Sequence, residues 1–267
     1  MKNNSFQIDY KSKAIKRSRV SERIKNYDFL INISEKQILK KIESFPIKMD
    51  FVIELGGNTN LSELIYKKDK NNFFFIRSDC SFDVLNNNNT SNQNLVFPEH
   101  YFPFKNEILS AVFSCLYIDS TYNSQNIFSN IYKALKKNGI LIFSIFGSKT
   151  MKNVKEYFLK VEEKIYGGIS LRFHPLYDIK LVGNNLKNIG FSNVIVETET
   201  VEVIYDNLFK LIYDLRGMGA TNNLLHRSKH FTPKSLFNEV NNFLINENMD
   251  KRFSVPFEIL TITAWKK

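Results

Sequence analysis

Short apolar runs alternate with helix-like segments between residues 50 and 165, and this alternation constrains the fold more than any other feature of the chain. The runs "DFVIEL", "NNFFFIRSD", "ILSAVFSCLYI" and "GILIFSIFG" are bounded by polar or glycine residues and are typical of buried strands. Strands that alternate with helices form parallel sheets through crossover connections. The pattern therefore predicts an α/β fold with an open, doubly wound, Rossmann-like sheet, which binds ligands beyond the carboxyl ends of its strands.

Local signals predict where the helices begin and end. Ser34 and Gln37 belong to a capping box, so we expect a helix to begin there. Asn60 is expected to start the helix after the first strand. Another helix is predicted over residues 126–137 and should end at the pair Asn138-Gly139. The polar stretch over residues 86–94 is of low complexity and predicts a loop.

The same alternation continues after Gly167-Gly168 with a helix, a strand, two helices and a final strand. We expect these over residues 178–188, 193–203, 208–215, a segment opened by Thr232-Pro233, and 257–266. Residues 204–250 then lie between the last two strands. An insertion at this point could cover the ligand end of the sheet, so we expect it to form a cap.

The chain is basic, with 37 Lys and Arg against 27 Asp and Glu, and part of the excess lies near the N-terminus. A run of cations without interleaved aromatic residues is typical of a solvated helix face or a flexible arm, and a phosphate-binding patch is the alternative. We expect residues 1–26 to form a basic arm, with an acidic surface as its partner; nucleic acid is a secondary hypothesis. The cations are Lys11, Lys13, Lys16, Arg17, Arg19, Arg23 and Lys25.

Other totals favour a soluble protein in a reducing compartment. The longest apolar runs are too short to span a bilayer, and the basic arm lacks the apolar stretch of a signal peptide. Cys80 and Cys115 are only two and lie far apart, so a disulfide framework or a cysteine metal site is not expected.

The segment "FVIELGGNTN", residues 51–60, runs from a strand through a glycine turn towards a helix, as loops that hold a nucleotide cofactor do. With the other motifs in place, the chain resembles the class I S-adenosylmethionine-dependent methyltransferases. Within them it resembles the family of the complex I assembly factor that hydroxylates an arginine and, more distantly, the malonyl carrier-protein methyltransferase of biotin synthesis. The resemblance covers residues 27–265. It is carried by "YDFL", "ELGG", "YFPFKNEILSAVFSCLY", "ALKKNGILIFSIFG", "GFSNVIVETETVEVIYDNLFKLIYDLRGMGATN" and "VPFEILTITAWK", of which "DLRGMGATN" is the most specific segment.

The resemblance implies a seven-stranded sheet with an antiparallel last strand, formed by residues 27–267, and a cofactor site at the first two strands. Glu54 and Gly56 keep the acid and the first glycine of the family's loop, while Asn58 and Asn60 stand at the next two glycine positions. Asparagine tolerates left-handed backbone, so the path of the loop can survive. Asp79 stands at the position of the acid that binds the ribose hydroxyls in the family. The implied cofactor contacts are Glu54, Gly56, Gly57, Asn58, Asp79 and Glu99. Glu99 stands beside the family's adenine-contacting position. The alternative is that the glycine only forms a turn and that the acids at the strand ends are solvated.

For a substrate, the resemblance implies a pocket formed in part by the segment Asp214–Asn222. The alternative is that Gly217 or Gly219 only ends a helix. Two pairings stay open: Arg216 with a substrate carboxylate, or Asp214 with a cationic guanidinium. The implied substrate-binding residues are Asp214, Arg216, Thr221, Asn222 and His174, and His174 is alternatively a loop histidine with its hydrogen bonds satisfied.

No catalytic residue is identified from the sequence. His226 and His230 have the spacing of metal ligands on a helix, but the neighbouring cations favour surface histidines, and no metal is expected. Three hypotheses for the function remain. The first is an enzyme of the complex I assembly type that modifies a protein arginine, with S-adenosylmethionine as cofactor and a complex I subunit as partner. The second is a methyltransferase that acts on a malonyl carrier protein or a small carboxylate, and the third is a non-catalytic assembly chaperone. We expect a cytoplasmic location, or the inner face of the respiratory membrane through the basic arm, and the mitochondrial matrix if the source is eukaryotic.

Overall fold

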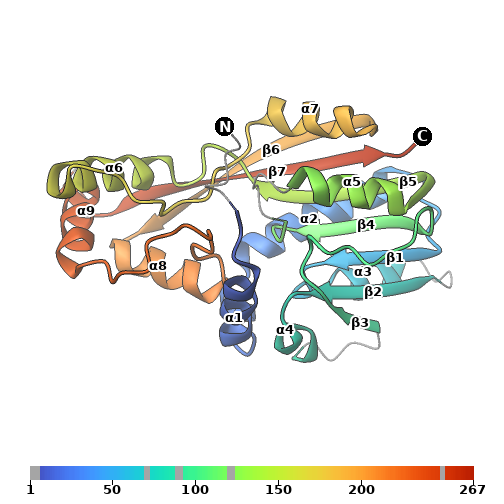
Figure 1. The fold of residues 1–267 in the computed structure, drawn as a ribbon, viewed down its shortest axis with the longest axis horizontal. Coiled ribbons are helices and arrows are strands. Elements are labelled where there is room, and N and C mark those ends of the chain that lie inside the picture. Colours follow the sequence, from blue (N-terminus) through green and yellow to red (C-terminus); the bar gives the residue numbers. More distant parts are fainter. Residues whose placement is uncertain (1–6, 69–72, 88–92, 119–123, 247–249) are drawn as a thin grey trace.

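The computed structural model describes residues 7–68, 73–87, 93–118, 124–246 and 250–267. Within these ranges, seven strands form one sheet in the order β3-β2-β1-β4-β5-β7-β6 (Figure 1). Strands β3, β2, β1, β4 and β5 pair in parallel, whereas β7 is antiparallel to both β5 and β6. The predicted α/β fold with an antiparallel last strand is confirmed. The strands are β1 (Phe51–Leu55), β2 (Phe74–Asp79), β3 (Gln93–Val96), β4 (Leu109–Cys115), β5 (Leu135–Phe146), β6 (Ser192–Tyr205) and β7 (Phe253–Trp265).

Helices cover both faces of the sheet. Successive side chains of a strand point to opposite faces, so neighbouring residues enter different cores. Ile53 and Val112 pack with residues of α5 and α7, whereas Val52 and Phe113 pack with residues of α2 and α3. The continuous apolar runs are therefore strands buried on both sides. The helices are α1 (Tyr10–Val20), α2 (Phe29–Ser44), α3 (Leu61–Lys68), α4 (Phe82–Asn86), α5 (Ser124–Ala134), α6 (Lys152–Tyr166), α7 (Ile179–Ile189), α8 (Leu208–Gly217) and α9 (Lys234–Asn246), with a 3-10 turn, η2, over Ile24–Tyr27.

A helical lobe of α6, α8 and α9 extends from one end of the sheet (Figure 1). Its apolar core contains Val154, Leu208 and Leu236 from the three helices and Phe257 from β7. Helices α8 and α9 lie between β6 and β7 in the chain, where the insertion is expected. That this lobe caps a substrate stays a prediction.

The capping-box prediction is wrong. Helix α2 begins at Phe29, so Ser34 lies inside it. Ser34 is fully buried, and its hydroxyl hydrogen-bonds the Ser144 hydroxyl of β5. The apolar face of α2 begins with Leu30, which packs in the core of the lobe. Packing against distant strands therefore extends the helix beyond its local start signal.

Two other boundaries differ from the prediction. Helix α5 ends at Ala134 and β5 begins at Leu135, so Asn138 lies within this strand, with a φ of 64°. The pairing of β4 with β5 shifts register here, so Asn138-Gly139 forms an irregularity in a strand and does not end a helix. In the polar stretch, Asn86 ends α4, and Gln93 and Asn94 belong to β3; residues 88–92 lie outside the described residues.

Candidate functional site

Three acidic side chains are buried near the carboxyl ends of β1, β2 and β3. Glu54 and Asp79 are 0% exposed, and Glu99, three residues beyond β3, is 1% exposed. Strands β1, β2 and β3 are neighbours and run parallel, so their ends meet at one edge of the sheet. The alternative of solvated strand-end acids is therefore wrong, and these acids need partners because a buried charge without one is costly.

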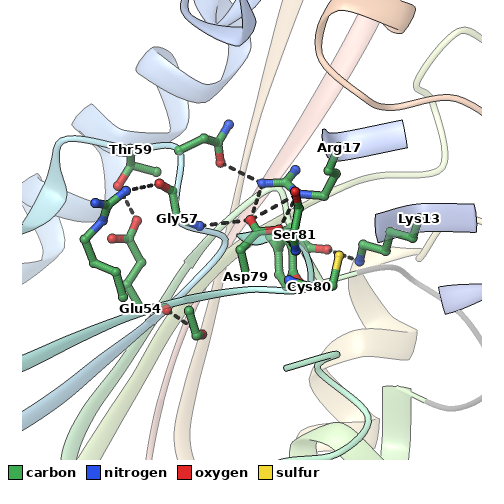
Figure 2. A network of polar contacts seen from close by, with 12 residues as sticks. Lys13, Arg17, Glu54, Gly57, Thr59, Asp79, Cys80 and Ser81 are labelled. Carbon is green, nitrogen blue, oxygen red and sulfur yellow. Dashed lines mark hydrogen bonds and ion pairs between the residues drawn. The ribbon is translucent and has the colours of Figure 1, made fainter. Parts of the chain in front are cut away.

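The Asp79 carboxylate is held by main-chain and side-chain donors together (Figure 2). The N–H of Ser81 donates to Oδ1 at 2.9 Å, and the N–H of Gly57 donates to Oδ2 at 3.2 Å. Arg17 Nε donates to both oxygens, at 2.9 and 3.0 Å, and a second nitrogen of the guanidinium donates to Oδ2. Burial by itself lowers the pKa of Arg17, but Asp79 raises it above its ordinary value, so the guanidinium remains charged.

A second cation of α1 meets the second acid. Lys13 Nζ forms an ion pair with Glu99 and donates to the main-chain oxygen of Tyr117 at 2.9 Å. Both cations lie over the face of the Tyr117 ring, with Lys13 Nζ at 4.2 Å and the Arg17 guanidinium carbon at 4.9 Å from the ring centroid. The expectation of a solvated arm is wrong for these two residues, which are 5% and 7% exposed. Arg19 and Lys11 of the same helix are exposed, as expected.

The glycine loop is shaped by its protein neighbours. Gly56 has a φ of +95°, and an added Cβ would lie 2.6 Å from Cβ of Tyr117. A Cβ on Gly57 would lie 2.3 Å from a methyl carbon of Leu85. Neither Asn58 nor Asn60 has a positive φ, so the loop does not use the tolerance of asparagine for left-handed backbone. Asn58 is buried, and its Oδ1 accepts a hydrogen bond from Arg17 at 3.3 Å.

Glu54 has a raised pKa. Burial raises its pKa to about 7, although Arg77 and the hydroxyl of Thr59 act in the opposite direction. Thr59 donates to Oε1 of Glu54, whereas Oε2 is buried without a hydrogen-bond partner among the described residues. Glu54 therefore changes its protonation state near neutral pH.

The candidate substrate residues of α8 and the loop after it are in different surroundings. Asp214 is half-buried and accepts a hydrogen bond from the hydroxyl of Tyr205 at 3.0 Å. Arg216 is exposed, and its side chain has no hydrogen bond or ion pair with the residues that the structure describes. Thr221 is half-buried. The sequence left two pairings open, Arg216 with a carboxylate or Asp214 with a guanidinium. In the structure the Arg216 guanidinium is available to an anion, whereas the Asp214 carboxylate already accepts a hydrogen bond from Tyr205.

Asn222 and His174 come together in the structure. The Asn222 side-chain amide donates to the main-chain oxygen of Leu171 at 2.6 Å, and its Oδ1 accepts from the N–H of Leu224 at 3.0 Å. His174 Nε2 accepts from the N–H of Asn223 at 3.3 Å. These bonds connect the loop after α6 to the loop after α8 and account for both side chains structurally. A substrate contact by either one stays a prediction.

The signature segment Asp214–Asn222 contacts the N-terminal region. A Cβ on Gly217 would lie 2.2 Å from the ring of Tyr27, and one on Gly219 would lie 3.4 Å from Val20. Lys16 Nζ donates to the main-chain oxygen of Asn222. Gly217 therefore does more than end α8, because it also makes room for the Tyr27 ring of η2, whereas a Cβ on Gly219 would make only ordinary contact with α1.

His226 and His230 are exposed, which confirms the prediction of surface histidines, and they lie in a segment that is not helical. Among the described residues, no group of three or more His, Cys, Asp or Glu side chains is arranged to hold a metal ion. Within the same ranges, none of the helices has the length and hydropathy needed to cross a bilayer.

Sequence reasoning missed Lys13, Arg17 and Tyr117 as parts of this site. The available signal was the spacing of α1, because Lys13, Arg17 and Val20 are separated by four and three residues and therefore lie on one helix face. That spacing shows that the three residues share one helix face, but it does not show which residues this face contacts.

No family model matches the sequence. Solved structures with the same fold include a Bacillus halodurans protein assigned as a methyltransferase, with a TM-score of 0.58 and 14% identity over 86% of this chain and 99% of that one. A SAM-dependent methyltransferase from Thermotoga maritima has a TM-score of 0.52 and 15% identity over 96% of this chain and 100% of that one. These structures show that the chain has the fold of the class I S-adenosylmethionine-dependent methyltransferases.

Two kinds of sequence relative have more specific names than these solved structures do. Human "Arginine-hydroxylase NDUFAF5, mitochondrial" is 23% identical over 98% of this chain and 77% of its own length. "Malonyl-[acyl-carrier protein] O-methyltransferase 1" of Coxiella burnetii is 22% identical over 90% of this chain and 82% of its own length. These similarities point to an enzyme.

Proposed function

We propose that this chain is an enzyme that binds S-adenosylmethionine at the carboxyl ends of β1 and β2 and modifies an arginine side chain of a partner protein. The observation that supports the cofactor site is the anchored carboxylate of Asp79. The N–H groups of Gly57 and Ser81 hold this carboxylate at the strand ends, independently of Arg17. A carboxylate fixed in this way matches the two hydroxyls of a ribose.

The other residues of the site also fit such a cofactor. Glu99 offers an acceptor to the amino edge of an adenine. Glu54 Oε2 and Asn58 Nδ2 are buried polar atoms without a hydrogen-bond partner among the described residues, and a polar ligand group at this edge would satisfy such atoms. When bound, S-adenosylmethionine supplies a methyl group on a positively charged sulfur. The chain's own residues would bind and orient the reactants, which supplies much of the rate increase in transfers of this kind.

The arginine half of the proposal is supported by similarity and by one side chain. The relative that matches 98% of the chain is named an arginine hydroxylase. Asp214, in the signature segment, presents a half-buried carboxylate, and a carboxylate pairs with a guanidinium through two parallel hydrogen bonds. We propose a complex I subunit as partner, in the cytoplasm at the inner face of the respiratory membrane, with Lys11, Arg19 and the other exposed cations of the N-terminal region available to an acidic surface.

The cofactor proposal is tested by equilibrium binding. S-adenosylmethionine should bind the full chain, and Asp79→Asn, which keeps the size of the side chain but removes its charge, should weaken binding by about tenfold or more, the size of a charged hydrogen bond. Asp206→Asn, on the exposed surface of the lobe, is the matched control and should leave affinity unchanged. Isothermal titration and thermal shift measure both variants. Equal binding by wild type and Asp79→Asn would contradict the assigned ribose contact.

A second function is favoured by Arg216, whose exposed guanidinium has no described partner: methylation of a malonyl group on a carrier protein. Arginine modification predicts loss of product in Asp214→Asn and retention in Arg216→Gln. Malonyl methylation predicts the reverse. Mass spectrometry of an arginine-containing subunit and of a malonylated carrier, each incubated with the two variants, separates these functions. If Asp79→Asn with Glu54→Gln still supports complex I assembly in cells, the chain acts as a chaperone without cofactor chemistry.

A further inference from the structure

We propose that helix α1 is a built-in competitor of the cofactor: Arg17 and Lys13 occupy the two acids of the nucleoside site and must leave them before a nucleoside binds. This inference rests on the proposed cofactor site and adds the regulation of that site. Figure 2 shows both cations reaching from α1 towards the strand ends.

The contacts of Asp79 leave no acceptor for a ribose. A carboxylate has about four lone-pair positions. In the structure, Asp79 receives hydrogen bonds from Ser81 and Gly57 of the main chain and from two nitrogens of Arg17. The carboxylate is also 0% exposed. Hydroxyl groups of a nucleoside can therefore reach it only after the guanidinium withdraws.

The helix meets every strand end that forms the site. Arg17 contacts Asn58 in the loop after β1 and Asp79 at the end of β2. Lys13 contacts Glu99 beyond β3 and Tyr117 beyond β4. Ligands of a doubly wound sheet bind at this edge of the strands. One helix thus contacts the ends of four adjacent strands, or the segments that follow them, at the edge where the proposed cofactor would lie.

The buried face of α1 carries charged side chains, which distinguishes a helix that competes with a ligand from a helix that only packs against the sheet. Of the three buried residues of α1, which are Lys13, Arg17 and Val20, two are charged. Apolar side chains would fill such a position without the cost of removing two cations from water. The cations instead match the acids that a nucleoside's polar groups would use. Arg17 and Lys13 therefore take the place of the ligand's hydrogen-bond donors.

A neighbouring side of α1 is attached to the segment after α8. Arg227 contacts Asp9 at 3.0 Å and the Ser12 hydroxyl at 3.1 Å, and Lys16 donates to the main-chain oxygen of Asn222. The helix therefore connects the nucleoside site to the loop proposed to meet the substrate. Binding at the first site should alter the contacts of the second, and by linkage the effect is reciprocal.

The first experiment measures amide hydrogen exchange of the wild-type full chain with and without S-adenosylhomocysteine, a ligand that carries the nucleoside but no methyl group to transfer. If α1 competes with the ligand, exchange over residues 10–20 should speed up by about tenfold or more when the ligand is bound, because the helix loses its docking contacts. Helix α7, on the distant part of the sheet, is the internal control and should not change. Slower exchange of α1 in the presence of ligand would overturn the inference, because the helix would then close over the ligand.

The second experiment compares two double variants of α1 that each remove two positive charges. Lys13→Gln with Arg17→Gln breaks both ion pairs, whereas Lys11→Gln with Arg19→Gln alters only exposed residues. The first variant should bind S-adenosylhomocysteine about tenfold more tightly than wild type, because more molecules have an open site. The second should bind as wild type does.

The outcomes separate this inference from the proposed function. Equal affinity in wild type and both variants overturns competition by α1 and leaves the cofactor site standing. Absence of binding in all three overturns both. The exchange experiment needs no substitution, so it decides the question even where the first double variant does not fold.

Discussion

Glu54 shows how one buried carboxyl changes with pH. It lies at the end of β1 with no exposed surface, and burial raises its pKa from 4.5 to about 7. Between these two values the folded protein holds a proton that the unfolded chain has released. The free energy of unfolding should therefore fall as the pH rises from about 4.5 to about 7, and this contribution should level off above pH 7.

Glu54→Gln should remove that dependence, since glutamine does not titrate. A shift of this size corresponds to a stability difference on the order of 3 kcal/mol. We expect the variant to be more stable than wild type at pH 8 and to show a flatter profile between pH 5 and 7, measured by urea unfolding at each pH. Glu156→Gln, exposed on α6, is the control and should keep the wild-type slope. An unchanged slope in Glu54→Gln contradicts the assignment of the raised pKa to this carboxyl.

At the scale of elements, the end of α8 and the turn η2 depend on each other. Gly217 is the last residue of α8, and the ring of Tyr27 lies directly against it. Tyr27 also makes an edge contact with Tyr213, with ring centroids 5.5 Å apart. The glycine is needed for this close approach, although alanine has the better helix propensity.

Gly217→Ala should therefore destabilise the protein by about 1–3 kcal/mol, the usual cost of overpacking. The matched control is Gly168→Ala, because a Cβ at that position meets nothing within 4 Å and its φ is not positive. We expect the control to change stability by less than about 0.5 kcal/mol. Denaturant midpoints of the two variants provide the comparison, and similar midpoints would show that Tyr27 can move aside at little cost.

At the scale of the whole molecule, β7 joins two apolar cores. Its residues Leu260 and Ile262 pack with the sheet and α5, whereas Val255 and Phe257 pack with the helices of the lobe. A strand that belongs to both cores should make the sheet and the lobe unfold together. The lone Trp265 at the end of β7, in edge contact with Phe45, reports on the sheet.

Leu236→Ala, in the core of the lobe, should lower the free energy of unfolding by about 2–5 kcal/mol. Because β7 couples the two parts, the transition followed by Trp265 fluorescence should shift with the transition followed by circular dichroism. Phe231→Ala, which removes a fully exposed ring, should shift neither. If Trp265 fluorescence keeps its wild-type midpoint in Leu236→Ala, the lobe unfolds as a separate unit.

Most strands of the sheet could be predicted from local sequence patterns, but β3, which begins within a stretch predicted as a loop, could not. The apolar runs predicted β1, β2, β4, β5 and β7, because the period and length of such runs report burial within one element. The resemblance supplied the candidates Glu54, Asp79 and Glu99, which the structure brings to one edge of the sheet. Contact with a cofactor stays a prediction for all three.

Which side chains contact one another depends on the folding of the whole chain. Ser34 bonds a serine 110 positions away, and Arg17 and Lys13 pair with acids 62 and 86 positions away. Local patterns cannot reveal such partners, because pairing depends on which strand ends are adjacent, and the order β3-β2-β1-β4 sets that adjacency. The cations of the N-terminal region have the composition of a solvated arm. Two of them are buried because the folded sheet gathers Asp79 and Glu99 within reach of one helix face.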